Sequence, residues 1–403
     1  MRKWLIFILV LLISWSMAAQ TDSLRLGYSL RGRVVDAVNG QPLESVYVST
    51  PGKHHATVTN ADGSFNLKSD SPIVQIEFTH LGYKKLSRPA TENMKIALQR
   101  ENLSLAEASI ISGDPLEIVK AALGRRGETF CTEAELMECF YRETIRKRNR
   151  YIYVAEAVAQ LFKSPFNGKV YDDAAALEKS RVLVSQRRSD TLSVITLGGP
   201  TLAIQNDILK NNSILFNIED MELYSFHMEM PAYMGDRLQF VIAMEPAQEA
   251  QYALFHCKLY IDRELLTFTR IEAYLDMSDK SKATQSILVH KPLGLRFFPE
   301  ETSMIMNYSL QDGKTRLEYF RSTIRFACDW RKRLFKTRYT AVNELVVTDV
   351  RPEAIRIPRK DRFNPKDCLS QKAKEFLDPN FWQDYNIIEP SESLEHAIGR
   401  LRK

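Results

Sequence analysis

The sequence predicts a protein that is mainly β with some α (α+β), and three observations indicate this class. Residues 26–100 contain short runs in which apolar and polar residues alternate between turns, as in a β-sandwich. Residues 114–150 carry helix-capping residues and apolar stripes of helical spacing. Alternation returns in residues 151–403, which predicts a large antiparallel β-rich domain with a C-terminal helical tail.

Residues 1–19 predict a signal peptide. Arg2 and Lys3 precede an apolar run, and small residues follow it up to Ala19, which is the pattern of a cleavable export signal. The run is shorter than the ~20 residues that span a membrane as a helix, and no later stretch is long and apolar enough to span one. Cleavage after Ala19 leaves Gln20 as the N-terminus, with no cysteine nearby for a lipid anchor. We therefore expect an exported protein, in the periplasm or associated with the outer membrane.

The composition is that of a globular protein and argues against a nucleic-acid partner. Of the 403 residues, 44% are hydrophobic and 26% are charged, and the net charge is +5. Without the two cations of the signal peptide it falls to about +3, too small a bias to bind nucleic acid. The five cysteines are an odd and sparse set without metal-binding spacing, so we expect mostly buried thiols with at most one or two disulfides of open pairing. They are Cys131, Cys139, Cys257, Cys328 and Cys368.

The predicted sandwich begins with residues 30–37, LRGRVVDA, and turn residues follow at 39–42. An acidic turn at Asn60–Gly63 then separates two alternating strands. A calcium loop of the EF-hand type needs a third ligand before its glycine and a glutamate soon after it, and neither is present. We therefore interpret Asn60–Gly63 as the turn of a β-hairpin, with Gly63 at positive φ. The apolar members of the predicted strands include Val46, Val48, Phe65, Leu67, Val74, Ile76, Phe78, Ile96 and Leu98.

The order of these strands and turns resembles the carboxypeptidase-regulatory-like domain, a small prealbumin-like sandwich found in envelope proteins of Bacteroidetes-type bacteria. The matching landmarks are Gly32, Val34, Asp36, Gly40, Pro42, Leu43, Val46, Val48, Thr59, Asp62, Gly63, Phe65, Gly82 and Tyr83. The resemblance implies a folding or interaction module without catalytic groups or zinc ligands. His54, His55 and His80 do not form a metal set, because neighbouring residues of a strand face opposite sides.

Residues 114–150 predict two helices. Asp114 can cap the first helix, Pro115 suits its first turn and Gly124 can end it. The second helix begins at Thr132, with Glu135 three residues later as a capping box. It ends near the cationic stretch 146–150, RKRNR.

Residues 151–319 contain further alternating runs with short connections, which predicts neighbouring antiparallel strands. Residues 311–314 form a turn between two of them, and the less regular segment 163–212 is interpreted as a long excursion from the sheet. In the tail, Ser391 or Ser393 can cap a last helix. Phe381 and Trp382 are expected to pin the tail to the body, with a ligand platform as the alternative. The strands are carried by Ile152, Val154, Val158, Leu238, Phe240, Ile242, Phe255, Cys257, Leu259, Ile261, Leu266, Phe268, Met304, Met306, Tyr308, Leu310, Leu317 and Tyr319.

Two wider resemblances extend beyond the sandwich. Residues 139–158 and 381–390 resemble secreted proteins of Bacteroidetes-type bacteria that join this sandwich to a helical linker and a β-rich domain, and this resemblance implies no activity. Residues 258–275, KLYIDRELLTFTRIEAYL, are similar to periplasmic lipoprotein carriers of the LolA and LolB type. Those carriers are curved sheets wrapped on helices, so this resemblance implies a half-barrel that could hold a hydrophobic ligand.

The sequence contains none of the nucleophile, zinc-protease or dinucleotide-binding motifs that mark common enzymes. The one cluster with catalytic character is Arg142, Glu143 and Glu156. Glu156 shares a strand face with aliphatic residues, and a buried carboxylate has a raised pKa unless it is paired. We favour a buried Arg142–Glu156 ion pair that fixes the helix against the sheet over a catalytic acid. The sequence therefore assigns no catalytic, cofactor-binding or metal residue, and predicts no cofactor.

Three functions follow in order of preference. The first is a non-catalytic envelope protein that acts as an interaction or binding module, with another envelope protein or a hydrophobic ligand as its partner. The second is a periplasmic carrier of a lipid-like ligand in a half-barrel domain. The third is a hydrolase that uses Glu156 or Glu143.

Overall fold

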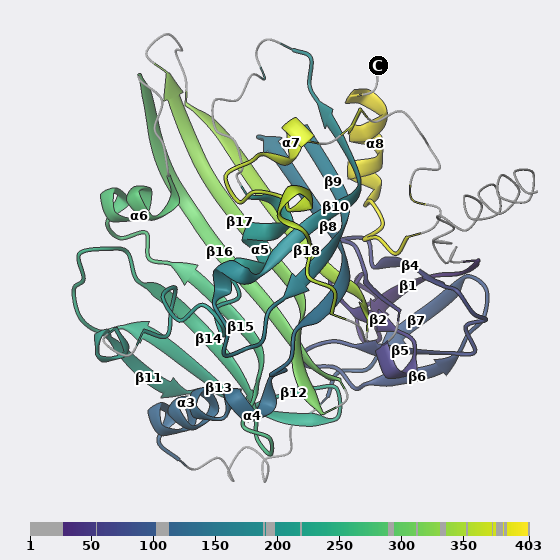
Figure 1. Ribbon diagram of the computed structural model, residues 1–403, viewed down its shortest axis with the longest axis horizontal. Coiled ribbons are helices and arrows are strands. Elements are labelled where there is room, and N and C mark those ends of the chain that lie inside the picture. Colours follow the sequence, from purple (N-terminus) through teal and green to yellow (C-terminus); the bar gives the residue numbers. More distant parts are fainter. Residues whose placement is uncertain are drawn as a thin grey trace, which may run out of the picture.

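The computed structural model shows a small β-sandwich beside one large, mainly antiparallel sheet, which confirms the predicted class (Figure 1). The sandwich lies at the lower right of the picture, and the long strands of the large sheet run through its centre. The residues that the structure describes are 27–53, 55–101, 113–187, 190, 198–217, 220–288, 294–311, 313–330, 336–351, 354–372, 374–375, 382 and 385–401. The predicted signal peptide, His54 and Phe381 therefore lie outside the described residues.

The sandwich packs a three-stranded sheet, in the order β4-β1-β7, on a four-stranded sheet, in the order β3-β2-β5-β6. Its alternating apolar residues meet between the two sheets, with Val34, Phe65 and Phe78 almost fully buried. The strands are β1 (Tyr28–Asp36), β2 (Tyr47–Ser49), β3 (Ala56–Val58), β4 (Ser64–Ser69), β5 (Gln75–Thr79), β6 (Leu86–Pro89) and β7 (Met94–Leu98).

The acidic turn is a structural turn, but it does not join two paired strands. β3 and β4 belong to different sheets, so Asn60–Gly63 leads the chain across the sandwich rather than closing a β-hairpin. The Asn60 side-chain oxygen accepts hydrogen bonds from the backbone N–H groups of Asp62 and Ser64, both at 2.9 Å. Gly63 has φ 74°, as expected, and its carbonyl accepts a hydrogen bond from the N–H of Val34 at 2.8 Å.

The first predicted helix is present and the second is not. α3 (Pro115–Gly124) begins where Asp114 accepts a hydrogen bond from Leu116 N–H at 2.9 Å, and α4 (Arg126–Thr129) follows directly. The expected helix from Thr132 is instead strand β8 (Glu135–Lys147). β8 is buried along most of its length because both faces of the sheet are covered there, so the alternation that marks a strand is lost.

The large sheet has the strand order β11-β13-β14-β15-β16-β17-β18-β8-β9-β10-β19, with β12 also paired to β13. All pairs are antiparallel except β10 with β19, as the short connections predicted. The strands after β8 are β9 (Arg150–Lys163), β10 (Ala174–Val184), β11 (Tyr224–Met228), β12 (Ala232–Met234), β13 (Arg237–Pro246), β14 (Phe255–Asp262), β15 (Phe268–Leu275), β16 (Leu295–Gln311), β17 (Lys314–Trp330), β18 (Thr337–Arg351) and β19 (Lys374–Glu375).

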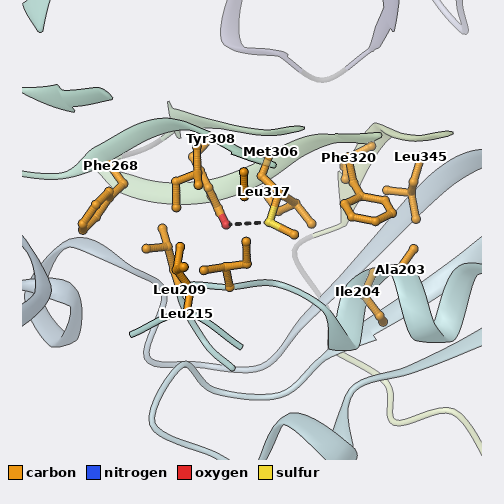
Figure 2. Close-up of a cluster of buried hydrophobic side chains, with 14 of the residues drawn as sticks. Ala203, Ile204, Leu209, Leu215, Phe268, Met306, Tyr308, Leu317, Phe320 and Leu345 are labelled. Atoms are coloured by element: carbon orange, nitrogen blue, oxygen red, sulfur yellow. Dashed lines mark hydrogen bonds between the residues drawn. The ribbon is translucent and has the colours of Figure 1, made fainter. Parts of the chain in front are cut away.

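The two faces of this sheet have different neighbours. The inner face, which carries Cys139 and Tyr141 of β8, packs on residues 199–217, including helix α5 (Gly199–Gln205). Figure 2 shows Ile204, Leu209 and Leu215 of this segment against aromatic and aliphatic residues of the sheet. The outer face carries the sandwich and the end of the chain. Residues 163–212 are thus not one excursion, because β10 is a full strand of the sheet, whereas residues 199–212 pack on its inner face.

The end of the chain joins the sandwich to the large sheet. We call Trp382 and residues 385–392 the C-terminal strap. The Asn386 side chain exchanges two hydrogen bonds with the backbone of Lys68 in β4, at 2.7 and 2.9 Å, and Thr57 of β3 donates to the Ile387 carbonyl at 2.8 Å. On the opposite side, Arg142 of β8 donates to the Ile388 carbonyl at 2.5 Å.

The acidic turn also supports the last helix. In α8 (Glu392–Leu401), Ser391 accepts from the N–H of Leu394 at 3.3 Å, as the sequence predicted. Asp62 accepts from the N–H of Glu392 at 2.7 Å, so a carboxylate of the sandwich caps the same helix end. The remaining short helices are α6 (Lys280–Ile287) and α7 (Leu369–Lys372).

None of the five cysteines forms a disulfide in the described part of the chain, and all but Cys131 are buried. Among the described residues, no helix has both the length and the apolar character that crossing a membrane requires.

Two glycines of the sandwich allow a matched test of the turn. Gly40 and Gly63 both have positive φ, but a Cβ at Gly40 would meet nothing within 4 Å, whereas a Cβ at Gly63 would lie 2.3 Å from the Val34 carbonyl oxygen. We expect Gly40→Ala to cost about 1–2 kcal/mol of unfolding free energy from backbone strain alone. Gly63→Ala should cost more, above ~3 kcal/mol, because the backbone must also move. Urea unfolding measures both, and a rise in stability on adding calcium would contradict a purely structural turn.

Candidate functional site

The register of the sheet places Arg142 of β8 directly opposite Glu156 of β9. The Arg142 Nε atom donates to Glu156 Oε1 at 2.8 Å, and both side chains are buried, which confirms the predicted ion pair. It joins two strands of one sheet, however, and not a helix to the sheet. Arg181 of β10 donates to the second oxygen, Glu156 Oε2, at 2.7 Å, so one carboxylate bridges two guanidinium groups.

The strap covers this buried triad. The Trp382 ring lies over the Arg181 guanidinium at 5.0 Å, and its Nε1 atom donates to Glu156 Oε2 at 3.3 Å. Trp382 also meets Phe140 edge-on, so it pins the tail to the body as expected. Burial alone would raise the pKa of Glu156, but the two guanidinium groups outweigh it and hold the pKa below its usual range. An ionised carboxylate locked in this way cannot act as a general acid.

Glu143 lies on the opposite, inner face of β8. Its two oxygens accept hydrogen bonds from Tyr141 at 3.0 Å and from Tyr153 at 2.9 Å, and 1% of the residue is exposed. Burial raises the pKa of Glu143 to about 7, and the two tyrosine hydrogen bonds oppose this rise only in part. The pKa would suit acid–base chemistry, but a group this deeply buried has no visible path to a substrate. The sheet therefore keeps Glu143 and Glu156 on different faces, and they do not form one catalytic site.

In the part of the chain that the structure describes, residues 199–217 occupy the inner face, where an open half-barrel would hold a hydrophobic ligand. Leu209 and Leu215 fill the space above β15–β17, and Ala203 and Ile204 fill it beside Phe320 (Figure 2). Buried ion pairs fix this segment in place: Asp207 is bonded to Lys163, and Lys210 lies 2.6 Å from Asp173. A lipid-like ligand could enter only if residues 199–217 left the sheet.

The described histidines of the sandwich lie apart. The Nε2 atom of His55 is 3.2 Å from the Asp70 carboxylate, while His80 is partly buried where the sandwich meets the large sheet. His54 lies outside the described residues. Burial and the nearby Arg270 cation lower the pKa of His80 to about 4, so its ring is neutral at physiological pH.

His80 lines a cavity of about 270 Å³ between the sandwich and the outer face, which we call the seam pocket. One wall comes from the sandwich and the other from β13–β17, with the β12–β13 turn at one side. Next to it, the Leu81 backbone bridges to Met234, and Gly82 N–H donates to the Tyr233 carbonyl at 2.8 Å. Residues that represent the two walls are Ser45, Thr79 and His80, and Thr269, Asn307 and Ser309.

The charges in the seam pocket balance. Its lining has three cations (Lys85, Arg237 and Arg270) and three carboxylates (Asp236, Asp262 and Glu318). Arg237 Nη2 donates to Asp262 Oδ1 at 2.8 Å, and Arg270 Nη1 donates to the Asn307 side-chain oxygen at 2.9 Å. The neutral His80 ring, hydroxyls and amides complete the wall. Such a lining suits an uncharged ligand that can form several hydrogen bonds.

The sequence analysis missed the seam pocket and Arg181. The pocket is made by residues of the sandwich and of several separate strands of the sheet, and no local motif marks such a site. Arg181 was hidden because a bulge between Leu177 and Lys179 breaks the alternation of β10.

Comparison with known proteins confirms the identity of the sandwich. Residues 30–110 match the model of the CarboxypepD_reg-like domain, which is the domain that the landmark residues predicted. The match spans about a fifth of the 403 residues, so it assigns this segment and not the whole chain. The search of curated proteins finds no similar sequence.

Three solved structures have a distant likeness to the chain. A DUF1329 family protein from Desulfovibrio piger is 12% identical, with a TM-score of 0.22, over 58% of this chain and 94% of its own. MucB in complex with MucA(peri) is 11% identical, with a TM-score of 0.18, over 60% and 100%. A protein of unknown function from Bacteroides fragilis, described as membrane-associated, is 8% identical, with a TM-score of 0.14, over 80% and 98%. At these TM-scores none of the three supports an inference about fold or function.

The buried triad predicts an asymmetric response to mutation. Glu156→Gln would leave two buried guanidinium groups without a counter-charge, and we expect it to cost about 3–5 kcal/mol of unfolding free energy. Arg142→Met should cost less, about 1–3 kcal/mol, because Arg181 still neutralises Glu156. The double variant should lose less than the sum of the two. Thermal unfolding of the variants measures these losses. The control is Glu117→Gln, which removes one partner of an exposed ion pair on α3. Unchanged melting with Glu156→Gln would contradict the structural role.

Glu143 predicts a pH dependence of stability. Its pKa is about 7 in the folded protein and near 4.5 when unfolded, so between these values the folded state holds the extra proton. The free energy of unfolding should therefore fall as pH rises from about 4.5 to 7, by roughly 3 kcal/mol from this group. Burial also raises the pKa of Glu138 to about 7, so the difference between wild type and Glu143→Gln isolates Glu143. Urea unfolding from about pH 5 to pH 8 should show a flatter profile for the variant, and parallel profiles would refute the assignment.

Proposed function

We propose that this protein is a non-catalytic envelope protein that acts as a binding module, and that the seam pocket holds its ligand. The observation that carries the proposal is that the pocket has one wall from each of two units, which the strap fixes to one another. A pocket between two units held in this way needs little rearrangement to bind, which lowers the entropic cost of association.

Two further observations support a binding role over a hydrolytic one. Glu156 is neutralised by two guanidinium groups, and Glu143 is enclosed by two tyrosine hydroxyls, so neither carboxylate faces the pocket. The balanced charge of the lining favours a small uncharged ligand rich in hydroxyl or amide groups. For the location, the basis is the predicted signal peptide: a mature chain that begins at Gln20 supports export, and an intact Met1 contradicts it.

Blocking the pocket from either wall tests the binding proposal. Ser309→Trp on β16 and Thr79→Trp on the sandwich would each fill it, and Ser225→Trp on edge strand β11 is the matched control. Neutral disaccharides and end-blocked dipeptides serve as probes in saturation-transfer NMR. We expect at least one probe to bind wild type and the control but neither pocket variant.

The same experiment separates a binding module from an enzyme. A probe that is recovered chemically unchanged agrees with the proposal. If wild type hydrolyses a probe and the Glu143→Gln variant does not, a hydrolase becomes the better hypothesis. Equal binding of every probe to all four proteins, or no binding to wild type, would overturn the seam pocket as the ligand site.

A further inference from the structure

The sheet brings two cationic stretches together that are far apart in the sequence. The β8–β9 turn lies within RKRNR at 146–150, and β18 begins beside Lys336 and Arg338. Because Lys147 pairs with Tyr339, the Arg148 N–H donates to the Arg338 carbonyl at 2.9 Å.

A hollow of about 700 Å³ opens between these strand ends, and we call it the basic hollow. Four cations line it, against the single lining carboxylate Glu300. Arg338 pairs with Glu300 at 2.9 Å, and Arg325 pairs with Glu301 at 3.0 Å. The other two cations, Arg148 and Lys336, have no carboxylate partner among the residues that the structure describes. Lys336 instead lies over the Phe298 ring, 3.8 Å from its centre.

The β8–β9 turn places Arg148 at the tip of a hairpin in a left-handed backbone conformation. Arg148 and Asn149 form a two-residue turn between the paired residues Lys147 and Arg150, and Arg148 has φ 54°. This left-handed conformation costs a residue with a side chain roughly 1–2 kcal/mol, and glycine would adopt it freely. Two-residue hairpin turns favour positive φ, so the turn accounts for this conformation, and it places the Arg148 side chain in the lining of the basic hollow.

From the excess of cations over carboxylates and the size of the hollow, we propose that the basic hollow binds a ligand that carries two or more phosphate groups. A guanidinium group can donate two parallel hydrogen bonds to two oxygens of one phosphate, and an ammonium group adds a point charge. The hollow is large enough for a small organic ligand, and its unpaired cations come from two different strand ends, so a single phosphate would engage only part of it. Such a ligand is either a soluble polyphosphorylated compound or the headgroups of an anionic lipid surface.

The test removes the two unpaired cations in Arg148→Gly/Lys336→Gln. The matched control, Arg359→Gln/Lys360→Gln, removes the same charge from an exposed turn elsewhere. Tripolyphosphate is the soluble probe in calorimetry, and vesicles of phosphatidylglycerol with phosphatidylcholine are the lipid probe in co-sedimentation. We expect wild type and control to bind at low salt, the basic-hollow variant to bind at least ~10-fold more weakly, and added salt to weaken binding.

The two probes identify the source of the phosphate. Vesicle binding without binding of free tripolyphosphate assigns a lipid headgroup, and binding of tripolyphosphate without vesicle binding assigns a soluble ligand. Arg148→Gly alone should melt at the same temperature as wild type or higher, because it relieves the strained turn. Equal weakening in the basic-hollow variant and the control, or no binding of either probe by wild type, would overturn the proposal.

Discussion

The structure depends on how one carboxylate, Glu156, is buried. Taking an ionised group out of water is expensive, and Arg142 and Arg181 repay that cost only because the surrounding structure holds them at hydrogen-bond distance from both oxygens. The three residues come from three adjacent strands, so the triad fixes the register of β8, β9 and β10 on the outer face. It also requires a cover, since two cations on one carboxylate leave a net positive charge. In the strap, the Ile388 carbonyl oxygen accepts a hydrogen bond from Arg142, and the face of the Trp382 ring lies over Arg181, so both place partial negative charge beside the cations.

The strap therefore connects the charge balance of the sheet with the position of the sandwich. The same short segment bonds to Arg142 on one side and to Thr57 and Lys68 on the other. Its apolar residues join Tyr47 and Val58 of the sandwich and Phe140 of the sheet in one buried cluster. This cluster joins residues more than 300 positions apart, so the seam depends on contacts of long range in the sequence.

The two faces of the large sheet are stabilised by different means. The inner face is closed by apolar packing and by buried ion pairs between the sheet and residues 199–217, which leaves it little room for a ligand. The outer face carries polar and charged residues that remain in reach of solvent at the seam pocket and at the basic hollow. The two hollows differ in charge: the seam pocket is balanced and the basic hollow is positive. Both proposed binding sites thus lie on the outer face of the sheet.

The sequence by itself determined the local features. Turns and helix caps at Asp114, Gly63 and Ser391 depend on contacts within a few residues. The alternation in the sandwich and in β13–β17 indicates sheets with one buried face and one more exposed face. Only the tertiary structure decided the rest. β8 was mistaken for a helix because both its faces are buried, which removes the alternation that marks a strand. The chance capping pattern at Thr132 and Glu135 was then the only local signal, and it predicted a helix. Arg181, the seam pocket and the basic hollow arise from segments that are distant in the chain. Their positions depend on strand register and on the docking of the strap, which are set by packing across the whole molecule and not by the order of neighbouring residues.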